Sequence, residues 1–197
     1  NLETGCIKIG ISTTLTKEFL LPYLEEFNQM YPKIDIKIIT NITSDLISKL
    51  KNGLIDMVIL NLNDKNYGND IEFIKCKKIN DCFVVSNKYK DIVGKEISLK
   101  ELNKYPLILQ AKGSNTREFL DNVARENGVV LKPSIELTSY SLVVDFAKIG
   151  FGIGYATREY IKDLIKDKKL FELNIKEKIP SRYVGIALSK NHVPSFS

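Results

Sequence analysis

Hydroxyl-bearing side chains recur where the sequence predicts that a helix begins directly after a strand. The segments are Ser12-Thr13-Thr14, Thr43-Ser44, Ser114-Asn115-Thr116 and Ser139-Tyr140-Ser141. The first turn of a helix has backbone N–H groups without an intrahelical acceptor, and the helix dipole places a partial positive charge there. Several such helix starts at the carboxyl ends of strands therefore predict a site for a small anion. Because Ser and Thr cap helices throughout proteins, each segment taken alone is better explained as a structural cap.

The residues needed for covalent catalysis are missing. His192 is the only histidine, it follows the last predicted strand, and no Ser or Cys stands in a nucleophile-elbow context. Gly150-x-Gly152-x-Gly154 resembles a phosphate loop, but position 157 is Thr and a strand follows instead of a helix. We interpret this run as a helix C-cap and a point of close packing. The sequence thus predicts a protein that is not an enzyme and has no cofactor.

Composition excludes several classes of protein. The 197 residues are 44% hydrophobic and 27% charged, which is not the composition of a disordered, collagen-like or disulfide-scaffold chain. At this size about 70% of the unfolded chain's surface is buried on folding, so no disulfide or metal is required for stability. The net charge of +5 is spread along the chain among acids, which disfavours a groove for nucleic acid.

The cysteines and the ends of the chain bear on its location. Cys76 and Cys82 are the closest pair and lack metal-ligand spacing, so we predict no metal site and buried, reduced thiols of a cytoplasmic protein. No apolar run approaches the roughly 18 residues of a membrane helix, and no signal peptide opens the chain. Because residue 1 is Asn, either a signal was removed or the chain is a piece of a longer protein, and composition leaves both open.

The first eighty residues alternate between strand and helix patterns, which predicts a βαβ-type module. The predicted strands cover 6–11, 34–40 and 57–60. A long helix follows Thr14 and continues to Met30, and Pro22 either stands in its first turn after a looser start or bends it. Thr43 and Ser44 are N-cap candidates for a shorter helix.

The rest of the chain repeats this alternation. The predicted strands cover 79–86, 107–110, 135–137, 153–156, 170–173 and 183–188. The predicted helices are one from Ser98 that Pro106 ends, one from Asn115 that ends before Gly128, and those over 142–149 and 158–166. Ser98 to Glu101 and Asn115 to Glu118 match the capping-box signature.

No linker rich in Pro, Gly or Ser separates the two modules, which predicts α/β lobes joined by continuous strands. The strand over 183–188 is expected to return to the first lobe. Lobe I then consists of residues 1–80 plus 184–197, and lobe II of residues 81–183. We expect the crossings near Ile79 to Val84 and near Arg182 to Val184, with a hinge there.

Two ordered sets of residues carry a resemblance to a known family. In the first half these are Ile9 to Leu15, Leu20-Leu21-Pro22 with Phe27, Tyr31-Pro32 and Gly53 to Asp56. In the second half they are Pro106-Leu107-Ile108, Gly113-Ser114 with Arg117, and Val143 to Gly154. In order and spacing, nearly the whole chain resembles the effector-binding domain of LysR-type transcriptional regulators.

The resemblance implies two Rossmann-like lobes of the type II periplasmic-binding-protein fold, with a small effector in the cleft between them. By position, it implies effector-binding residues from both lobes: Ser12, Thr13, Thr14, Thr43 and Asn61 from lobe I, and Gln110 and Ser139 from lobe II. The Ser-Thr-Thr sequence looks like that of members that recognise small inorganic or carboxylate anions. The effector would change the angle between the lobes and so control DNA binding by the full-length protein.

The resemblance also implies partners. It implies a homodimer in which the lobe I helix over 16–30 packs against lobe II of the partner, and a tetramer of the full-length protein. The family's N-terminal helix-turn-helix is absent from this chain, so DNA would be contacted only through that missing domain, and no membrane is involved. The alternative is an extracytoplasmic solute-binding protein of a transporter with the same fold, freed of its signal.

Overall fold

The computed structural model describes residues 4–63 and 65–192, which divide into two compact units. Unit 1 combines the chain up to Lys77 with the chain from Tyr183 onward, and unit 2 is the continuous stretch Lys78–Arg182. The sequence places these boundaries after residues 80 and 183, where the structure has them after Lys77 and Arg182. Each unit is built on a five-stranded mixed sheet with helices, so the predicted α/β class is confirmed.

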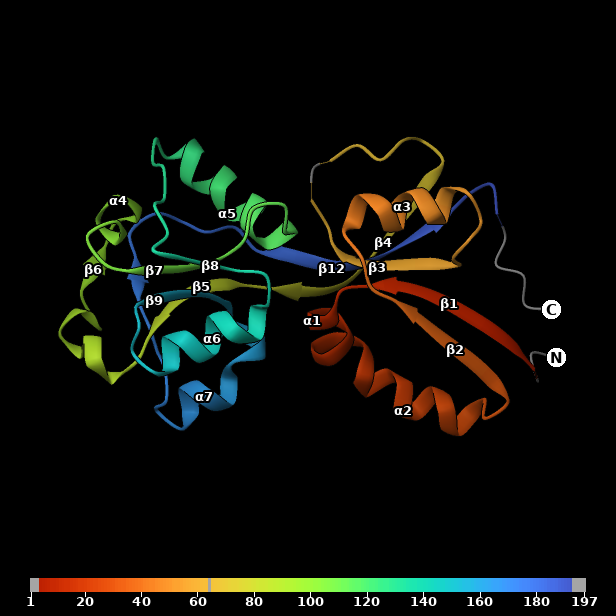
Figure 1. The fold of residues 1–197 in the computed structure, drawn as a ribbon, viewed down its shortest axis with the longest axis horizontal. Coiled ribbons are helices and arrows are strands. Elements are labelled where there is room, and N and C mark those ends of the chain that lie inside the picture. Colours follow the sequence, from red (N-terminus) through yellow and green to blue (C-terminus); the bar gives the residue numbers. More distant parts are fainter. Residues whose placement is uncertain (1–3, 64, 193–197) are drawn as a thin grey trace. The chain divides into compact units, whose positions relative to one another are not determined.

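Unit 1 is built on a sheet with the strand order β2-β1-β3-β12-β4. Its strands are β1 (Gly5–Ile11), β2 (Ile34–Ile39), β3 (Met57–Asn61), β4 (Ile71–Ile79) and β12 (Arg182–Ser189). Its helical segments are α1 (Thr13–Leu15), the π-helix η1 (Thr16–Leu20), α2 (Leu21–Met30) and α3 (Thr43–Lys51). Strand β1 is parallel to β2 and β3, whereas β12 is antiparallel to β3. Helices α2 and α3 lie on opposite sides of this sheet (Figure 1).

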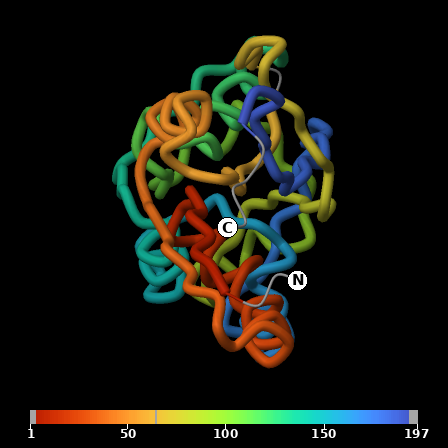
Figure 2. The backbone as a smooth tube through the Cα atoms, turned by 90° about the vertical axis from the view of Figure 1, so that its right-hand side faces the viewer, coloured from red at the N-terminus to blue at the C-terminus, as the bar shows by residue number. Residues whose placement is uncertain are grey.

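The return of the chain to unit 1 inserts its last strand inside the sheet. Strand β12 lies between β3 and β4, so it is an inner strand rather than an edge. Figure 2 shows the blue segment that contains β12 beside the yellow segment that contains β4. The two strands that connect the units are therefore neighbours in one sheet.

One face of the unit 1 sheet packs on α3. Leu46 and Leu50 of this helix are buried against Val58 of β3. Gly10 lets α3 approach β1 closely, because a Cβ at this position would lie 3.0 Å from Cδ2 of Leu46 in this helix. Close packing of α3 thus fixes the ends of the strands from which the candidate binding residues follow.

The long helix of unit 1 begins irregularly. The hydroxyl of Ser12 accepts a hydrogen bond from the Leu15 amide and caps α1, after which the backbone forms the π-helix over 16–20. Pro22 follows at the start of α2, directly after this π-helical turn. Of the two interpretations of Pro22, the looser start is confirmed.

Unit 2 contains a sheet with the order β10-β5-β9-β7-β8 and a small sheet of β11 and β6. Its strands are β5 (Asp81–Val85), β6 (Glu96–Ile97), β7 (Leu107–Gln110), β8 (Ile135–Leu137), β9 (Ile153–Thr157), β10 (Phe171–Glu172) and β11 (Asn174–Ile175). Its helices are the 3-10 helices η2 (Asn87–Ile92) and η3 (Arg158–Tyr160), with α4 (Leu99–Leu102), α5 (Asn115–Glu126), α6 (Tyr140–Lys148) and α7 (Lys162–Lys166). Helices α5 and α6 cover opposite faces of the larger sheet (Figure 1).

Successive residues of β5 pack into different apolar clusters, because helices cover this sheet on both sides. Phe83 belongs to the apolar cluster that includes Leu120 of α5, whereas Val84 belongs to the cluster that includes Val143 of α6. Successive strand residues point to opposite faces, so a strand between two helical layers is apolar at every position. All residues of β5 are buried, including Asp81 at its start.

Helix caps differ from the prediction at two places. The N-cap of α3 is Ile42, so the expectation that Thr43 or Ser44 caps this helix is wrong. The Asn41 side chain is what organises this turn, because its oxygen accepts a hydrogen bond from the Ile42 amide at 2.8 Å and its nitrogen donates to Asp45.

The second misplaced cap is at α5. Its N-cap is Ser114, whose hydroxyl accepts a hydrogen bond from the Arg117 amide at 3.1 Å, so the capping box predicted to start at Asn115 is wrong by one residue. The capping box of Ser98 and Glu101 is confirmed.

Other differences are of element length. The strand predicted over 79–86 is interrupted at Asn80, between β4 and β5. The helix predicted over 158–166 is divided into η3 and α7, and the one predicted over 142–149 begins already at Tyr140.

The glycine run is confirmed as a cap and a packing point. Gly150 has φ of 78° after the end of α6. A Cβ on Gly152 would lie 2.2 Å from the carbonyl oxygen of Pro106. Glycine is therefore required there by the approach of two backbones.

Candidate functional site

The predicted effector-binding residues form two groups, one in each unit. Five of them lie in unit 1, namely Ser12, Thr13, Thr14, Thr43 and Asn61, and Gln110 and Ser139 lie in unit 2. Within each unit the structure brings the members of its group to one edge of the sheet. The two edges are described separately below.

The edge in unit 1 is formed where parallel strands end together. Ile11 at the end of β1 is in register with Ile59 of β3, and Gly10 is in register with Ile39 at the end of β2. The residues that follow these strands therefore emerge at the same edge, as the carboxyl ends of parallel strands do. Asn61 lies there as the last residue of β3 and is paired with Val184 of β12.

The hydroxyls at this edge differ in whether they already make a hydrogen bond within the protein. Ser12 is engaged as the N-cap of α1, where its Oγ accepts from the Leu15 amide at 3.2 Å. Thr13 is exposed, Thr14 is half-buried, and neither side chain has a hydrogen bond to another described residue. These two hydroxyls are therefore available to a ligand.

The start of α3 is less suited to an anion than the start of α1. Thr43 is half-buried and is the first residue of α3, so its backbone amide is one of the amides without a helical acceptor. Asp45 already places a carboxylate in this first turn and pairs with Lys49 at 2.6 Å. This acid offsets the partial positive charge of the helix end.

The edge in unit 2 is formed by β7 and β8. Gln110 is the last residue of β7 and is in register with Leu137 of β8, which Ser139 follows as the N-cap residue of α6. The Ser139 hydroxyl lies 2.9 Å from the hydroxyl of Ser141 and makes no hydrogen bond to the helix backbone. Gln110 and Ser139 thus lie at the same edge of one sheet.

Arg117 holds this edge in place and was not predicted as a site residue. Its side chain is 3% exposed and donates through Nη1 to the Gln110 carbonyl at 2.9 Å and to Glu136 at 2.7 Å. Its Nε donates to Asp121 at 3.0 Å. Burial alone would lower the pKa of Arg117, but its hydrogen bonds to Asp121 and Glu136 raise it overall. The i,i+4 spacing of Arg117 and Asp121 was the signal available in the sequence.

A second polar cluster, also missed, lies buried where the chain enters and leaves unit 2. Arg182 donates to both carboxylate oxygens of Asp81, at 2.7 and 3.0 Å, and their side chains are 2% and 0% exposed. The Thr157 hydroxyl donates to Asp81 at 2.9 Å. Arg182 also reaches the Thr116 hydroxyl at 3.3 Å. Every charge in this cluster is therefore compensated, as burial requires.

Asn80, beside this cluster, explains the interruption between β4 and β5. Its backbone amide and its side-chain amide both donate to Glu159, each at 2.8 Å. Its side-chain oxygen accepts from the Ser181 hydroxyl at 2.6 Å. The Asn80 amide is therefore satisfied by a side chain, whereas its carbonyl still accepts from the Arg158 amide at 2.8 Å.

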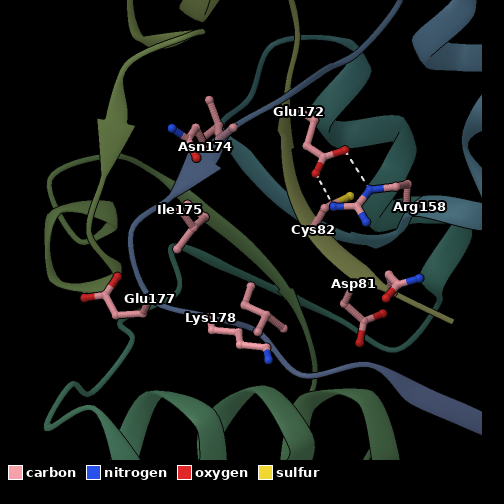
Figure 3. A pocket seen from close by; sticks show the side chains of 11 residues that line it. Asp81, Cys82, Arg158, Glu172, Asn174, Ile175, Glu177 and Lys178 are labelled. Atoms are coloured by element: carbon pink, nitrogen blue, oxygen red, sulfur yellow. Dashed lines mark hydrogen bonds and ion pairs between the residues drawn. The ribbon is translucent and has the colours of Figure 1, made fainter.

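A pocket of about 440 Å³ lies within unit 2, next to this cluster (Figure 3). It is lined by Asn80, Asp81, Cys82, Arg158, Glu172, Leu173, Asn174, Ile175, Glu177, Lys178 and Ile179. Arg158 forms an ion pair with Glu172 on its wall, and this hydrogen bond raises the pKa of Arg158. None of the predicted effector-binding residues lines it, and its charges are of both signs, so it differs from the predicted anion site.

The cysteines fulfil the prediction of buried thiols only in part. Cys82 is buried, and burial raises the pKa of its thiol strongly, which makes it unreactive. Cys76 is exposed on β4, so the prediction is wrong for this residue. Among residues 4–63 and 65–192, no three His, Cys, Asp or Glu side chains are grouped to hold a metal ion. In the same part of the chain, no helix has the length and apolar character to cross a membrane.

Comparisons with known proteins agree with this arrangement. The model of the LysR substrate binding domain family matches residues 1–196. The HTH-type transcriptional regulator CysL of Bacillus subtilis is 26% identical over 162 residues, which cover 82% of this chain and 54% of that protein. The chain spans about half the length of the curated relatives it matches.

Solved structures show the same fold. The CcmR regulatory domain of Synechocystis PCC6803 in complex with 2-PG has a TM-score of 0.80 and 22% identity, over 96% of this chain and 89% of that one. The effector binding domain of QuiR in complex with shikimate has a TM-score of 0.77 and 21% identity, over 96% of this chain and 89% of that one. The predicted type II periplasmic-binding-protein fold is confirmed.

Proposed function

We propose that this chain, which belongs to the LysR substrate binding domain family, binds a small anionic effector and thereby controls the transcriptional regulator of which it is a part. The relatives are named as HTH-type transcriptional regulators, which favours a sensor over the solute-transport alternative. The remaining part of such a regulator would contact the DNA. The domain senses its ligand without converting it, and we place it in the cytoplasm.

The observation that carries the proposal is the pair of hydroxyl-bearing sheet edges. In unit 1, Thr13 and Thr14 have free hydroxyls at a helix start directly after β1. In unit 2, Ser139 stands at the start of α6 beside the end of β7. Backbone amides and hydroxyls donate to an anion without bringing a charge that must itself be compensated. The effector-binding residues we propose are Ser12, Thr13, Thr14, Thr43, Asn61, Gln110 and Ser139.

The neighbours' ligands indicate the class of molecule. The CcmR domain was solved with 2-PG and the QuiR domain with shikimate, which is a carboxylate. Hydroxyl donors and helix starts suit a carboxylate or an inorganic oxyanion. We therefore propose an anion of this size as the effector. The binding cleft between the two units stays a prediction.

A thermal-shift screen with sulfate, phosphate, 2-PG and shikimate tests the ligand class. A ligand at about a hundred times its Kd stabilises the folded state by roughly 2.7 kcal/mol, which is a readily measured rise in Tm. No rise with any small anion would contradict the proposal.

Two variants then test the site with the anion that gives the largest shift. Thr13→Val and Ser139→Ala each remove one hydroxyl from a different unit and should weaken binding by roughly 1 to 3 kcal/mol, measured by calorimetric titration. Thr4→Val, at an exposed position before the start of β1 with no hydrogen bond to another described residue, is the matched control. If both test variants lose affinity, the ligand contacts both units. If both bind with unchanged affinity, the proposed site is wrong.

The exposed face of α2 supports the predicted homodimer. No residue of α2 is buried, and Leu21, Tyr23 and Met30 are 52%, 58% and 58% exposed. In unit 2, Ile149 and Phe151 near the end of α6 are 75% and 45% exposed. We propose that α2 of one subunit packs on unit 2 of its partner, and that the full-length protein is a tetramer.

Sedimentation equilibrium tests the dimer. Tyr23→Ser with Met30→Ser should shift the domain to monomer, because each side chain would lose its apolar contacts in the interface. Val130→Ser, at a residue 76% exposed in the connection between α5 and β8, is the control. A dimer of unchanged affinity in the double variant would place the interface elsewhere.

A further inference from the structure

The two places where the chain passes between units are bound to one another on the unit 2 side. The passages follow Lys77 and Arg182. Arg182 holds Asp81 by two hydrogen bonds of 2.7 and 3.0 Å, and the Ser181 hydroxyl donates to Asn80 at 2.6 Å. The ion pair is almost completely buried. A buried pair of this kind is costly to separate, so the two passages are held as one body.

This buried ion pair is attached to the first turns of two helices. Arg182 reaches the hydroxyl of Thr116, in the first turn of α5, at 3.3 and 3.4 Å. Its guanidinium also lies over the Phe119 ring, 5.0 Å from the centroid. The second helix is α6, which is connected to the ion pair through Thr157. The hydroxyl of Thr157 donates to Asp81, and its backbone amide donates to the hydroxyl of Tyr140, the first residue of α6, at 3.0 Å.

Both attachment points adjoin the edge proposed to bind the effector. Tyr140 directly follows Ser139, and Thr116 lies in the turn that Ser114 caps. The distances from Arg182 to Thr116 are longer than the usual 2.9 to 3.0 Å of such bonds, so this link can change without breaking the ion pair. A ligand that draws either helix start toward itself would alter these links first.

We infer that the Asp81–Arg182 pair, with Thr116 and Tyr140, transmits effector binding at the starts of α5 and α6 to both passages between the units at once. Thr116 and Tyr140 act in this as positioning residues. The inference rests on the proposed function for the source of the movement. The link between helix starts and passages is a property of the free domain and is testable without a ligand.

The first experiment uses the ligand-free domain. Thr116→Val keeps the shape of the side chain and leaves the ion pair intact, whereas Arg182→Ala would leave Asp81 buried without its partner and could unfold the domain. Hydrogen exchange of residues 78–82 and 181–184, measured by mass spectrometry, should accelerate by up to about fivefold in Thr116→Val, since fivefold is the change expected for loss of one hydrogen bond of ordinary length. Thr4→Val is the control. Acceleration confined to 115–118, or absent, overturns the inference.

The second experiment adds sulfate as the probe. Each variant is first titrated and then measured at a saturating sulfate concentration, so that differences in affinity do not change the exchange rates. In the unaltered domain sulfate should slow exchange in both passages together. In Thr116→Val and Tyr140→Phe it should slow exchange only near the helix starts, at 114–118 and 139–142. Tyr105→Phe, which removes a hydroxyl with no hydrogen bond to another described residue, is the control.

The two experiments separate the inference from the proposed function. If sulfate fails to bind, the anion proposal loses this ligand, while the first experiment still decides whether the helix starts and the passages are linked. If sulfate slows exchange in both passages equally in the unaltered domain and in both variants, the inference is overturned.

Discussion

The guanidinium of Arg117 donates to the backbone carbonyl of Gln110 at 2.9 Å, so a buried side chain of α5 fixes the last residue of β7. The same guanidinium is held by Asp121 and Glu136. The position of one proposed effector-binding residue therefore depends on a buried charge that two carboxylates hold in place.

Arg117→Lys should separate this positioning role from charge. Lysine keeps the positive charge but lacks the planar fork that serves three acceptors at once. We expect a loss of about 1 to 3 kcal/mol in the free energy of unfolding by urea, and weaker binding of the anion found in the screen. Arg125→Lys, at an exposed position on the same helix, is the control. Equal stability of both variants would contradict the role.

Ser12 and Thr13 should respond differently to loss of their hydroxyls, although they are neighbours. Ser12→Ala removes the cap of α1 and should lower the free energy of unfolding by roughly 0.5 to 2 kcal/mol. Thr13→Val removes no hydrogen bond within the described residues and should leave the unfolding free energy nearly unchanged. Urea unfolding of the two variants checks this, and a large loss in Thr13→Val would show that this hydroxyl is structural.

Gly152→Ala should be among the most damaging substitutions of a small residue. Its Cβ would lie 2.2 Å from the Pro106 carbonyl oxygen, which also accepts the Ile153 amide, so neither backbone can yield without loss of a sheet bond. We expect a loss above about 4 kcal/mol or failure to fold. Gly113→Ala, at φ of 92° with nothing within 4 Å of the new Cβ, should cost only about 1 to 2 kcal/mol, from backbone strain alone. Similar Tm values for the two variants would contradict this.

Glu159 should contribute to loss of stability in acid. Burial raises the pKa of Glu159, but hydrogen bonds from the backbone and side chain of Asn80 outweigh it and hold the pKa below the ordinary 4.5. The ionised form is therefore favoured by folding, and the stabilisation is complete above pH 4.5 and lost as the pH falls through the lowered pKa.

In Glu159→Gln the unfolding free energy should accordingly fall less between about pH 5 and pH 3. A glutamate with a lowered pKa titrates roughly within this range, and glutamine does not titrate. Glu126→Gln, at an exposed position of α5, is the control. An unchanged pH dependence in Glu159→Gln would show that the Asn80 bonds contribute nothing to acid sensitivity.

Many helices and strands could be predicted from the sequence because they depend on interactions between residues that are close together in the chain. The apolar run of β3 and the glycine after α6 are dictated by burial and by φ, which neighbouring residues reveal. Caps were less predictable, since at α3 the turn is made by Asn41 rather than by the hydroxyl at Thr43. A hydroxyl near a helix start therefore indicates that a helix begins there, but it does not identify the N-cap, which is the residue with extended backbone.

The buried polar cluster could not be predicted from local pattern. Asp81 and Arg182 are separated by 101 residues, and Asp81 and Thr157 by 76. A single acid at the start of an apolar strand is indistinguishable in sequence from a solvated one. Only the meeting of β5, β9 and the start of β12 shows that these side chains satisfy one another.

The inner position of β12 in the unit 1 sheet has a consequence for biosynthesis. While the ribosome is still making the chain, β3 lacks its antiparallel neighbour and β4 has no partner in the sheet until residues 182–189 emerge. Unit 2 is continuous in sequence and complete by then, so it should reach its native state first. The nascent N-terminal sheet would remain open at an apolar edge meanwhile, and protection by a chaperone would matter most for that half.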